Sequence, residues 1–244
     1  MLVAAMTDRS SVLLPAAEAP RSPDVSAAGE KTRATLVRVA LDLFGRKGYD
    51  ATSTRDIAGA AGVNIAGIAY HFGGKAGLHR ACGELVAEFL AERLIELSAG
   101  DPAEDAALTA EAAAAIFETV IGGIARFMLA EPEAEAIARF MVREQMDPSP
   151  TFDILYERLI EPRHRRLCRL WAAATGEDPA SEGSVIAVSA LFGQVMFFRV
   201  GRATALRRLG WETIDAGNVE AIVAILTANT RAILAAHRAG RASA

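Results

Sequence analysis

The sequence predicts an all-α fold, in which a small N-terminal head of three helices, of helix-turn-helix type, precedes a larger helical body. Alanine dominates the composition, and only 6% of the residues are aromatic. Alternating β-branched and polar residues, which mark half-buried strands, are nearly absent. Apolar residues instead recur at helical spacing between Gly and Pro breakers. With 244 residues, of which 52% are hydrophobic, the chain is long enough for one large or two small domains.

The N-terminal segment, residues 1–29, is predicted to be a disordered tail, because it contains three prolines among scattered Ser and Ala. Its arginines can reach phosphates, but a leader without a function, or a true start at Met6, is the simpler interpretation. The head is expected to span residues 30–76, and the body residues 77–244.

Two short helices that cross closely are predicted within residues 52–75, TSTRDIAGAAGVNIAGIAYHFGGK. The hydroxyl residues at 52–54 offer cap oxygens for a helix that ends at Ala61. Gly62 can take the positive φ that a tight turn between helices demands. Ile65–Phe72 is then the helix that enters a DNA major groove.

The head also carries a positive charge that the whole chain lacks. The formal net charge of the chain is -4, yet Glu30–Arg80 holds eight Lys or Arg against four Asp or Glu. Beyond Arg80 the counts are 16 and 23. A basic head on an acidic body is typical of a protein that touches nucleic acid with one end only.

The run IAGAAGVNIAGIAYHFGGKAGL at residues 57–78 resembles the DNA-binding signature of TetR-type repressors. Its closing residues Tyr70, His71, Phe72 and Lys75 match the Tyr, His, Phe and Lys positions of that signature. The NIA opening of the second short helix, REQ at 143–145 and GRATALRRLGW at 201–211 resemble the CecR-like branch. The resemblance implies a dimeric one-component transcription regulator, chiefly a repressor, that binds a palindromic operator and is released by a small-molecule effector.

Affinity for DNA is expected to come mainly from contacts with phosphates. The polar candidates are Thr52, Thr54, Arg55, Tyr70, His71 and Lys75. The resemblance implies that the last three lie against the DNA backbone. A half-buried place in the core is the alternative for Tyr70, and Phe72 is expected in the core.

Base reading is expected to lack the commonest specific contact, arginine to guanine, because no Arg or Lys lies between residues 62 and 74. Asn64 can pair with adenine or cap the helix. Ile65 and Ala66 can meet thymine methyl groups, and Gly67 lets the backbone come close. Arg55 can supply a polar base contact from the preceding helix.

The remaining helices follow from apolar spacing and breakers. They are expected over Lys31–Arg46, Lys75 to about Leu97, Leu108–Ala130, Glu133–Met146, Phe152–Thr175 with a bend at Pro162, Ser184–Arg202 and Val219–Arg238.

The last two helices, residues 184–202 and 219–238, are expected to form the homodimer surface, because residues 184–198 are apolar nearly all round. The residues expected there are Val185, Ile186, Val188, Leu191, Phe192, Val195, Val219, Ile222, Val223 and Leu226. Filling the core of the single chain is the alternative role.

The resemblance also implies a small-molecule pocket between body helices, for an effector that the sequence does not identify. The candidate lining residues are Phe117, Phe127, Phe140, Met141, Arg143, Gln145, Tyr156, Trp171, Gln194, Met196, Phe197 and Arg199. Aromatic residues at helical spacing are core more often than ligand contacts, so the polar residues are the better indicators. A buried arginine needs a partner, either a carboxylate such as that of Glu144 or an anionic ligand.

Other functions have weaker support in the sequence. None of the four histidines belongs to a metal or catalytic motif, and only Glu161 and His164 resemble part of a helical carboxylate site. No cofactor, metal or enzymatic activity is therefore expected. Cys82 and Cys168 lack C-x-x-C spacing, which indicates a reducing compartment. A thiol switch at Cys82 or at Cys168, which two arginines flank, and ligand-independent DNA binding are the alternatives.

Nothing in the sequence predicts export or a membrane contact. Asp8 precedes any basic residue at the start of the chain. The longest uncharged run, Gly183–Phe198, is shorter than the roughly 20 apolar residues that a membrane span needs. The cytoplasm is therefore the expected location.

Overall fold

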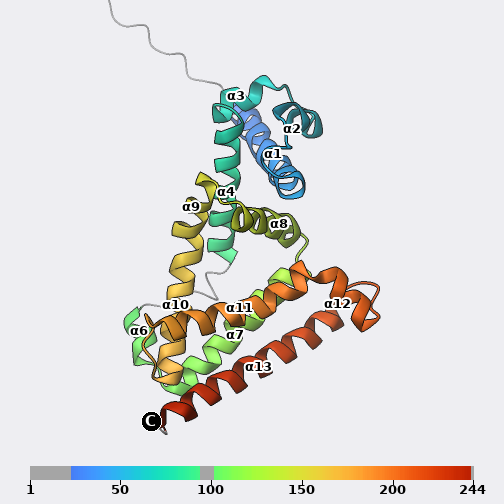
Figure 1. The fold of residues 1–244 in the computed structure, drawn as a ribbon. Coiled ribbons are helices and arrows are strands. Elements are labelled where there is room, and N and C mark those ends of the chain that lie inside the picture. The colour runs from blue at the N-terminus through green and yellow to red at the C-terminus, as the bar shows by residue number, and fades with distance from the viewer. Residues whose placement is uncertain (1–22, 94–101, 243–244) are drawn as a thin grey trace, which may run out of the picture.

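The computed structural model describes residues 23–93 and 102–242, and the regular elements within these ranges are all helices (Figure 1). They are α1 (Pro23–Lys47), α2 (Thr54–Ala61), α3 (Ala66–Phe72), α4 (Lys75–Arg93), α6 (Pro102–Ala107), α7 (Ala110–Ala130), α8 (Glu133–Met146), α9 (Pro150–Leu155), the π-helix η1 (Tyr156–Ile160), α10 (Glu161–Thr175), α11 (Glu182–Val200), α12 (Arg202–Leu209) and α13 (Ala216–Ala242). Figure 1 shows α1–α3 at one end of an elongated molecule and the end of α13 at the other. The predicted all-α fold, a helix-turn-helix head before a helical body, is confirmed.

The first hydrophobic core joins the head to the neighbouring part of the body. Leu36 and Phe44 of α1, Ile57 of α2, Ile68 of α3 and Leu78 of α4 are almost completely buried in it. The same cluster continues without a break into α8 and α9. Burial of one such side chain contributes about 1.5–3 kcal/mol, so the small head gains stability from helices outside it.

A second core lies between α7, α10, α11 and α13, around the fully buried rings of Phe117 and Trp171. The dimer prediction was wrong for seven residues, because their side chains are buried in this core of the single chain. They are Val188, Leu191, Val195, Val219, Ile222, Val223 and Leu226. The helical period of 3.6 residues shows which side chains share one face of α11 or α13. It does not show which of those faces packs against α7 and which is left for a second subunit.

Several helix boundaries differ from the predicted ones. α1 begins at Pro23, so residues 23–29 are helical and that part of the predicted tail was wrong; proline fits the first turn of a helix, where its missing N–H is not needed. Residues 1–22, and the predicted continuation of α4 to Leu97, lie outside the described residues. The short helices α6 and α12 were not predicted, because neither has a long apolar stripe.

A π-helical turn comes directly before Pro162, where a bend was predicted. α9, η1 and α10 follow one another directly, and Pro162 lies in the first turn of α10. Proline cannot donate a hydrogen bond and crowds the carbonyl four residues earlier, that of Arg158. The Arg163 guanidinium donates to the carbonyls of Arg158 and Leu159, at 3.4 and 3.2 Å. This side chain therefore replaces backbone bonds that the turn loses.

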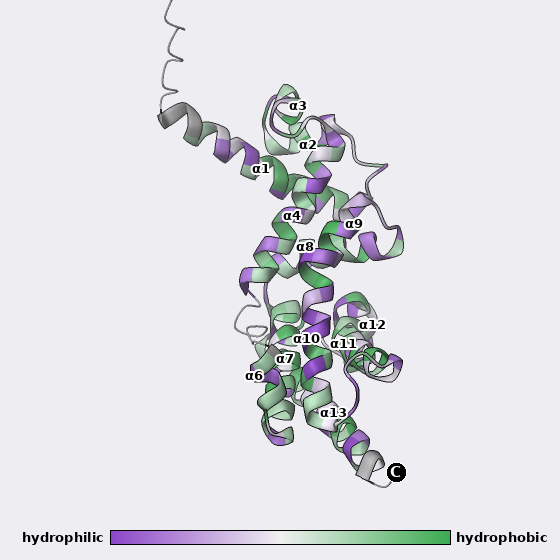
Figure 2. Cartoon of the chain, turned by 90° about the vertical axis from the view of Figure 1, so that its left-hand side faces the viewer, coloured by the Kyte–Doolittle hydropathy of each residue, from purple (hydrophilic) through white to green (hydrophobic). Residues whose placement is uncertain are grey.

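Three helices, α7, α11 and α13, are long and apolar enough to cross a membrane, by length and composition alone. They reach this length although the longest uncharged run is shorter, because the criterion tolerates a few charged residues. Half of the apolar window of α7 is buried inside the structure, against 22% for α11 and 33% for α13. Figure 2 shows the hydrophobic colour along α7 and a mainly hydrophilic α10. α11 and α13 thus keep apolar surface that this chain leaves uncovered.

The imidazole of His79 on α4 lies at the joint between head and body. Its ring centroid is 4.7 Å from that of Phe44 on α1 and 4.9 Å from that of Tyr49. Its Nδ1 lies 2.9 Å from the hydroxyl of Thr151 on α9, and its Nε2 lies 3.4 Å from the carboxylate of Glu144 on α8. Burial, with repulsion from Lys75, lowers the pKa of His79 from 6.5 to about 4. In the neutral ring, Nδ1 can accept from the Thr151 hydroxyl, and Nε2–H then faces the Glu144 carboxylate at the longer distance.

Acidification is expected to loosen this joint. Because the pKa of His79 is lower in the folded chain than in the unfolded one, the unfolded chain binds the proton first as the pH falls. The free energy of unfolding should hold above pH 6.5 and fall by at most about 3 kcal/mol as the pH approaches 4. Urea denaturation at a series of pH values measures this slope. His79→Gln should flatten it, and an unchanged slope in that variant would contradict the assignment.

Candidate nucleic-acid interface and ligand cavity

The first helix of the helix-turn-helix begins with a reciprocal pair of hydrogen bonds. The Ser53 hydroxyl accepts from the N–H of Asp56 at 3.0 Å, and the Asp56 carboxylate accepts from the N–H of Ser53 at 3.1 Å. These bonds lower the pKa of Asp56. A capping box of this kind fixes the residue at which α2 begins.

The turn between α2 and α3 depends on Gly62, whose φ of 66° lies in the left-handed region that side chains disfavour. Its N–H donates to the carbonyl of Gly59 at 3.2 Å, and that of Val63 donates to the carbonyl of Ala58 at 3.1 Å. These bonds close α2 and turn the chain toward α3.

The short helix α3 buries one side and leaves the other free. Ile68 is 1% exposed, whereas Tyr70 is 81% and Ile65 47% exposed. This exposure rules out the alternative that Tyr70 is a core residue. Ala66 is exposed and Gly67 half-exposed, and a Cβ on Gly67 would lie 3.8 Å from Leu36, an ordinary contact. Packing therefore does not require glycine at position 67.

Two of the predicted DNA contacts have partners within the chain. The Asn64 side chain accepts from the N–H of Ala66 at 2.9 Å, which is the capping role left open above. Thr52 is completely buried, and its hydroxyl donates to the carbonyl of Gly48 at 2.7 Å. Thr52 cannot reach a phosphate, so its predicted contact was wrong; this hydroxyl instead holds the loop after α1.

The remaining candidates lie at the surface of the head. Arg55 is exposed and Thr54 half-exposed in the first turn of α2, and the His71 ring packs edge-on against that of Tyr70, with centroids 4.9 Å apart. The Lys75 ammonium lies 4.2 Å from the centroid of the Tyr49 ring and 3.5 Å from the carbonyl oxygen of Asp50.

Two aromatic contacts of the head were missed from the sequence. Tyr49 holds the Lys75 ammonium in a cation–π contact, and the Arg33 guanidinium lies 5.5 Å from the centroid of the half-buried Phe72 ring. The only sequence signal for Tyr49 was an aromatic residue directly after the break at Gly48.

An apolar cavity of about 180 Å³ lies between the two cores. Its walls come from α4, α7, α8, η1, α10 and α11, and they include Leu90, Phe127, Met128, Met141, Gln145, Leu159, Arg163, His164, Leu167, Val188, Phe192 and Met196. An apolar cavity of about 150 Å³ is large enough for benzene, so this one has room for a slightly larger apolar group.

Four of the predicted pocket residues line this cavity: Phe127, Met141, Gln145 and Met196. The other eight do not line this cavity. Phe117, Phe140 and Trp171 are buried in the cores, the exposed Tyr156 ring lies tilted against that of Phe152, and Phe197 is 51% exposed. The Gln194 carbonyl accepts from Asn229, Arg143 donates to the carbonyls of Gly45 and Arg46 at the end of α1, and Arg199 lies in a separate cleft.

The polar groups of the cavity come from α8 and α10. Burial lowers the pKa of both Arg163 and His164. Arg163 Nε is buried without a hydrogen-bond partner among the described residues. The Ser189 hydroxyl donates to the carbonyl of Val185, so it accepts from Nε2–H of His164, and the Cys168 thiol donates to Nδ1. Arg163 Nε is thus the group left for a ligand.

Known proteins show the same arrangement of head and body. A family model of bacterial regulatory proteins, tetR family, matches residues 36–82, and one of the C-terminal domain of the HTH-type transcriptional dual regulator CecR matches residues 113–237. The CecR regulator of Shigella flexneri is 33% identical over 219 residues, which cover 87% of this chain and 96% of that protein. The chain belongs to the TetR family, in its CecR branch. Like its relatives, it is a DNA-binding transcription regulator and not an enzyme.

Solved structures of TetR-family proteins share the fold. AmtR of Mycobacterium smegmatis has a TM-score of 0.55 at 21% identity, with 92% of this chain and 98% of that chain covered. A TetR-like regulator of Rhodococcus sp. RHA1 has a TM-score of 0.56 at 20% identity, with 89% and 99% covered. Both comparisons include the body as well as the TetR-type head.

The thiols of this TetR-family chain are poorly placed for a redox switch. Cys82 and Cys168 are both buried, and burial raises the pKa of both thiols. The arginines beside Cys168 pair with Asp105 of α6 instead. Among the described residues, no group of His, Cys, Asp and Glu is arranged to hold a metal ion.

Proposed function

We propose that this TetR-family regulator is a cytoplasmic homodimeric repressor, which binds a palindromic operator through α3 of each subunit and leaves it when a small molecule fills the apolar cavity. Thr54, Arg55, Tyr70, His71 and Lys75 are the proposed phosphate contacts. Ile65, Ala66 and Gly67 meet the bases. A single head offers few contacts, whereas a dimer reads two half-sites about 34 Å apart or somewhat more.

Dimerisation is supported by the apolar surface that α11 and α13 leave uncovered. Ile186 is 58%, Phe197 51% and Val200 63% exposed on α11, and Ile225 on α13 is 60% exposed. A Cβ on Gly193 would have no atom within 4 Å, so this part of α11 is open to another helix. Two copies related by a two-fold axis bury such a self-complementary patch on both subunits at once.

Base reading by methyl contacts leads to a first prediction for DNA binding. Ile65→Ala removes an exposed apolar side chain directly before α3 and should leave the fold intact. We expect discrimination between operator and random duplex to fall by about 1–3 kcal/mol, while non-specific affinity stays the same. Competition binding with both duplexes measures the two affinities. Unchanged discrimination would rule out thymine methyl contacts by Ile65.

The observation that carries the effector proposal is the position of the cavity. Leu90 brings α4 to its wall, and α4 begins directly after α3. Val188, Phe192 and Met196 bring α11, the proposed dimer helix, to the opposite side. A ligand that separates α4 from α11 changes how the heads are held on the dimer. The ligand can weaken operator binding only to the extent that it binds one arrangement of the two heads more tightly than the other. The preferred ligand is a small apolar molecule with one acceptor group for Arg163.

Filling the cavity with protein is expected to remove the response to an effector. Met196→Trp places a larger ring against the cavity wall, so an apolar effector should lose its binding site. The operator affinity of Met196→Trp without effector shows whether the filled cavity favours the head spacing that binds the operator or the one that does not. The matched control is Met146→Trp, because Met146 is 81% exposed on α8. A Met196→Trp protein that still responds like the wild type would exclude this cavity as the effector site.

The function is tested most directly on the DNA next to the coding region of the protein. We expect the purified protein to protect a palindromic segment there, and compounds that fit the cavity to release it. Because the relative CecR is named a dual regulator, transcription should be measured for both loss and gain. If the purified protein were a monomer and bound every duplex with the same affinity, the proposal would be excluded.

A further inference from the structure

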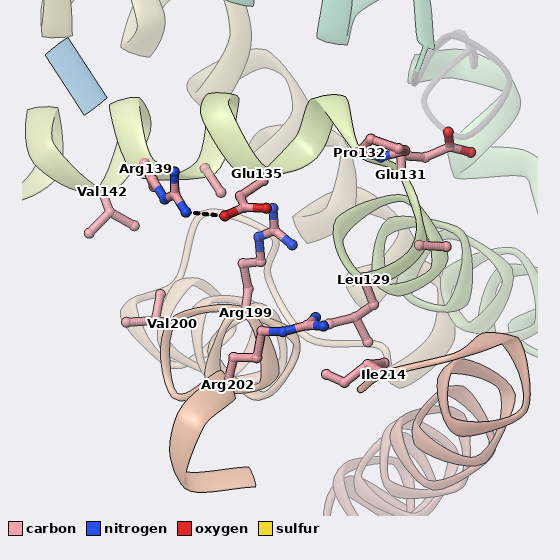
Figure 3. Close-up of a pocket in the computed structure, with 12 residues that line it drawn as sticks. Leu129, Glu131, Pro132, Glu135, Arg139, Val142, Arg199, Val200, Arg202 and Ile214 are labelled. Atoms are coloured by element: carbon pink, nitrogen blue, oxygen red, sulfur yellow. Dashed lines mark hydrogen bonds and ion pairs between the residues drawn. The ribbon is translucent and has the colours of Figure 1, made fainter. Parts of the chain in front are cut away.

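A second hollow, next to the apolar cavity, lies between α8 on one side and the end of α11 with the start of α12 on the other (Figure 3). Its volume is about 520 Å³, and its apolar walls include Leu129, Val142, Val200 and Ile214. The two sites meet at α8, where Ala138 and Val142 line both. Met141 and Gln145 line the apolar cavity, whereas Glu135 and Arg139 line this cleft. No part of the proposed function uses this cleft.

Three guanidinium groups come together in the cleft. Figure 3 shows Arg139 and Glu135 on the α8 side, with Arg199 and Arg202 extending into the space from α11 and α12. Arg139 pairs with Glu135 and lies 3.8 Å from the carboxylate of Asp42 on α1. Within the described residues, neither Arg199 nor Arg202 has a carboxylate within ion-pair distance, and Arg199 Nη2 is buried without a hydrogen-bond partner.

The cleft therefore carries an excess of positive charge. Its other carboxylate, that of Glu131, pairs with Arg93 at 3.1 Å, so the three arginines are offset only by Glu135 and by Asp42 of α1, which lies beside Arg139. Burial, and repulsion from Arg202 and Arg139, lower the pKa of Arg199, although Glu135 acts in the opposite direction. A buried guanidinium nitrogen without a partner costs stability. The ligand-free protein is expected to bear this cost at a site where a bound ligand supplies the acceptor that Arg199 lacks.

We propose that this cleft binds an organic phosphate monoester, with the phosphate between Arg199 and Arg202 and the organic group on the apolar walls. A phosphate monoester carries a charge of about -1.5 to -2 at neutral pH, which suits Arg199 and Arg202, the two arginines of the cleft that have no ion-pair partner among the described residues. Guanidinium groups suit phosphate oxygens because they donate two parallel hydrogen bonds. The apolar walls give the ligand a second attachment that inorganic phosphate lacks.

Occupancy of the cleft reaches the head through Arg139. A phosphate that attracts Arg139 competes with Asp42, and so changes one contact between α8 and α1. This coupling to the head rests on the proposed function, because it requires operator binding. Binding of the phosphate monoester in the cleft does not depend on the proposed function. The site is thus a second input, distinct from the apolar cavity.

Binding is tested by calorimetry and thermal unfolding of the full chain with phenyl phosphate, inorganic phosphate and phenol. We expect saturable, salt-sensitive binding of phenyl phosphate, weaker binding of inorganic phosphate and none of phenol. Arg199→Gln and Arg202→Gln should each weaken phenyl phosphate by about tenfold or more. The control is Arg207→Gln, an exposed arginine of α12, which should bind like the wild type.

Arg199→Gln should also raise the unfolding temperature of the free protein, because it removes a buried and repelled charge. A purely structural arginine would show the opposite change. The proposal is overturned if phenyl phosphate does not bind, or if both Gln variants bind it like the wild type. Phenol binding as tightly as phenyl phosphate would also overturn it.

The coupling is measured as operator affinity with and without phenyl phosphate, and we expect a change that Arg199→Gln abolishes. A protein that binds phenyl phosphate but no operator contradicts the proposed function and leaves the binding site standing. A protein that binds its operator but shows no calorimetric signal with phenyl phosphate contradicts this site alone.

Discussion

Gly77→Ala is expected to reduce operator binding to the level of non-specific binding, a loss of about a thousandfold or more. A Cβ on Gly77 would lie 1.8 Å from the carbonyl oxygen of Phe72, and real Cβ atoms essentially never come within 3.0 Å of another heavy atom. That carbonyl belongs to the last residue of α3, so it cannot move unless the helix moves with it. The turn between α3 and α4 must open, and α3 then no longer presents Ile65 and Tyr70 at the proper angle.

Fluorescence anisotropy with operator and random duplex measures this loss, and urea denaturation should show a cost of about 1–3 kcal/mol. Gly59→Ala is the matched control, because a Cβ on Gly59 has no atom within 4 Å and the residue lies within α2. That variant should gain roughly 0.5–1 kcal/mol of stability and keep its operator affinity. Wild-type operator affinity in Gly77→Ala would show that this turn does not fix the position of α3.

The helix-turn-helix was predictable because its signals are local. Gly62 needs the left-handed conformation, and Asn64 caps the helix two residues later, so both roles are decided within a few residues. The end of α2 at Ala61 and the end of α3 at Phe72 agree with the predicted residues. Pro162 also marked the place where regular α-helical hydrogen bonding is interrupted, although not the π-helical form of the interruption.

Roles that depend on distant residues could not be predicted in the same way. Thr52 and Thr54 have equal value as hydroxyl residues before a helix, and only the position of the loop after α1 buries Thr52. Arg143 was expected to need a carboxylate or a ligand, yet the free carbonyls at the end of α1 satisfy it. These hydrogen-bond partners depend on how α1 and α8 pack against each other. The residue pattern of a single helix does not predict that packing.

The ligand residues were the least predictable part. Apolar periodicity identifies a buried face, but Phe117 and Trp171 meet other core residues, whereas Phe127 and Met141 border a cavity. The difference arises where the six elements around the cavity fail to fill the space between them. The arginine cluster had no local signal at all, since Arg139 and Arg202 belong to helices far apart in the sequence.

Ile186→Glu is expected to convert the proposed dimer into a monomer. In a two-fold interface each residue occurs twice, so one substitution buries two carboxylates near each other in an apolar contact. Removal of these charges from water without a partner costs about 3–5 kcal/mol or more, which corresponds to at least a hundredfold weaker association. Ile186 is 58% exposed in the single chain, so the subunit itself should fold normally. Light scattering over a range of concentrations gives the mass, and circular dichroism checks the fold.

Loss of the dimer should lower operator affinity with it, because each head then binds a half-site alone. Met146→Glu is the matched control, since Met146 is also an exposed apolar residue, at 81%, but lies at the end of α8. It should leave both mass and operator affinity unchanged. If Ile186→Glu stayed dimeric, the uncovered side of α11 would not be the interface, and the spacing of the heads would have to be set by another surface. If it became monomeric yet kept full operator affinity, binding would not depend on two half-sites.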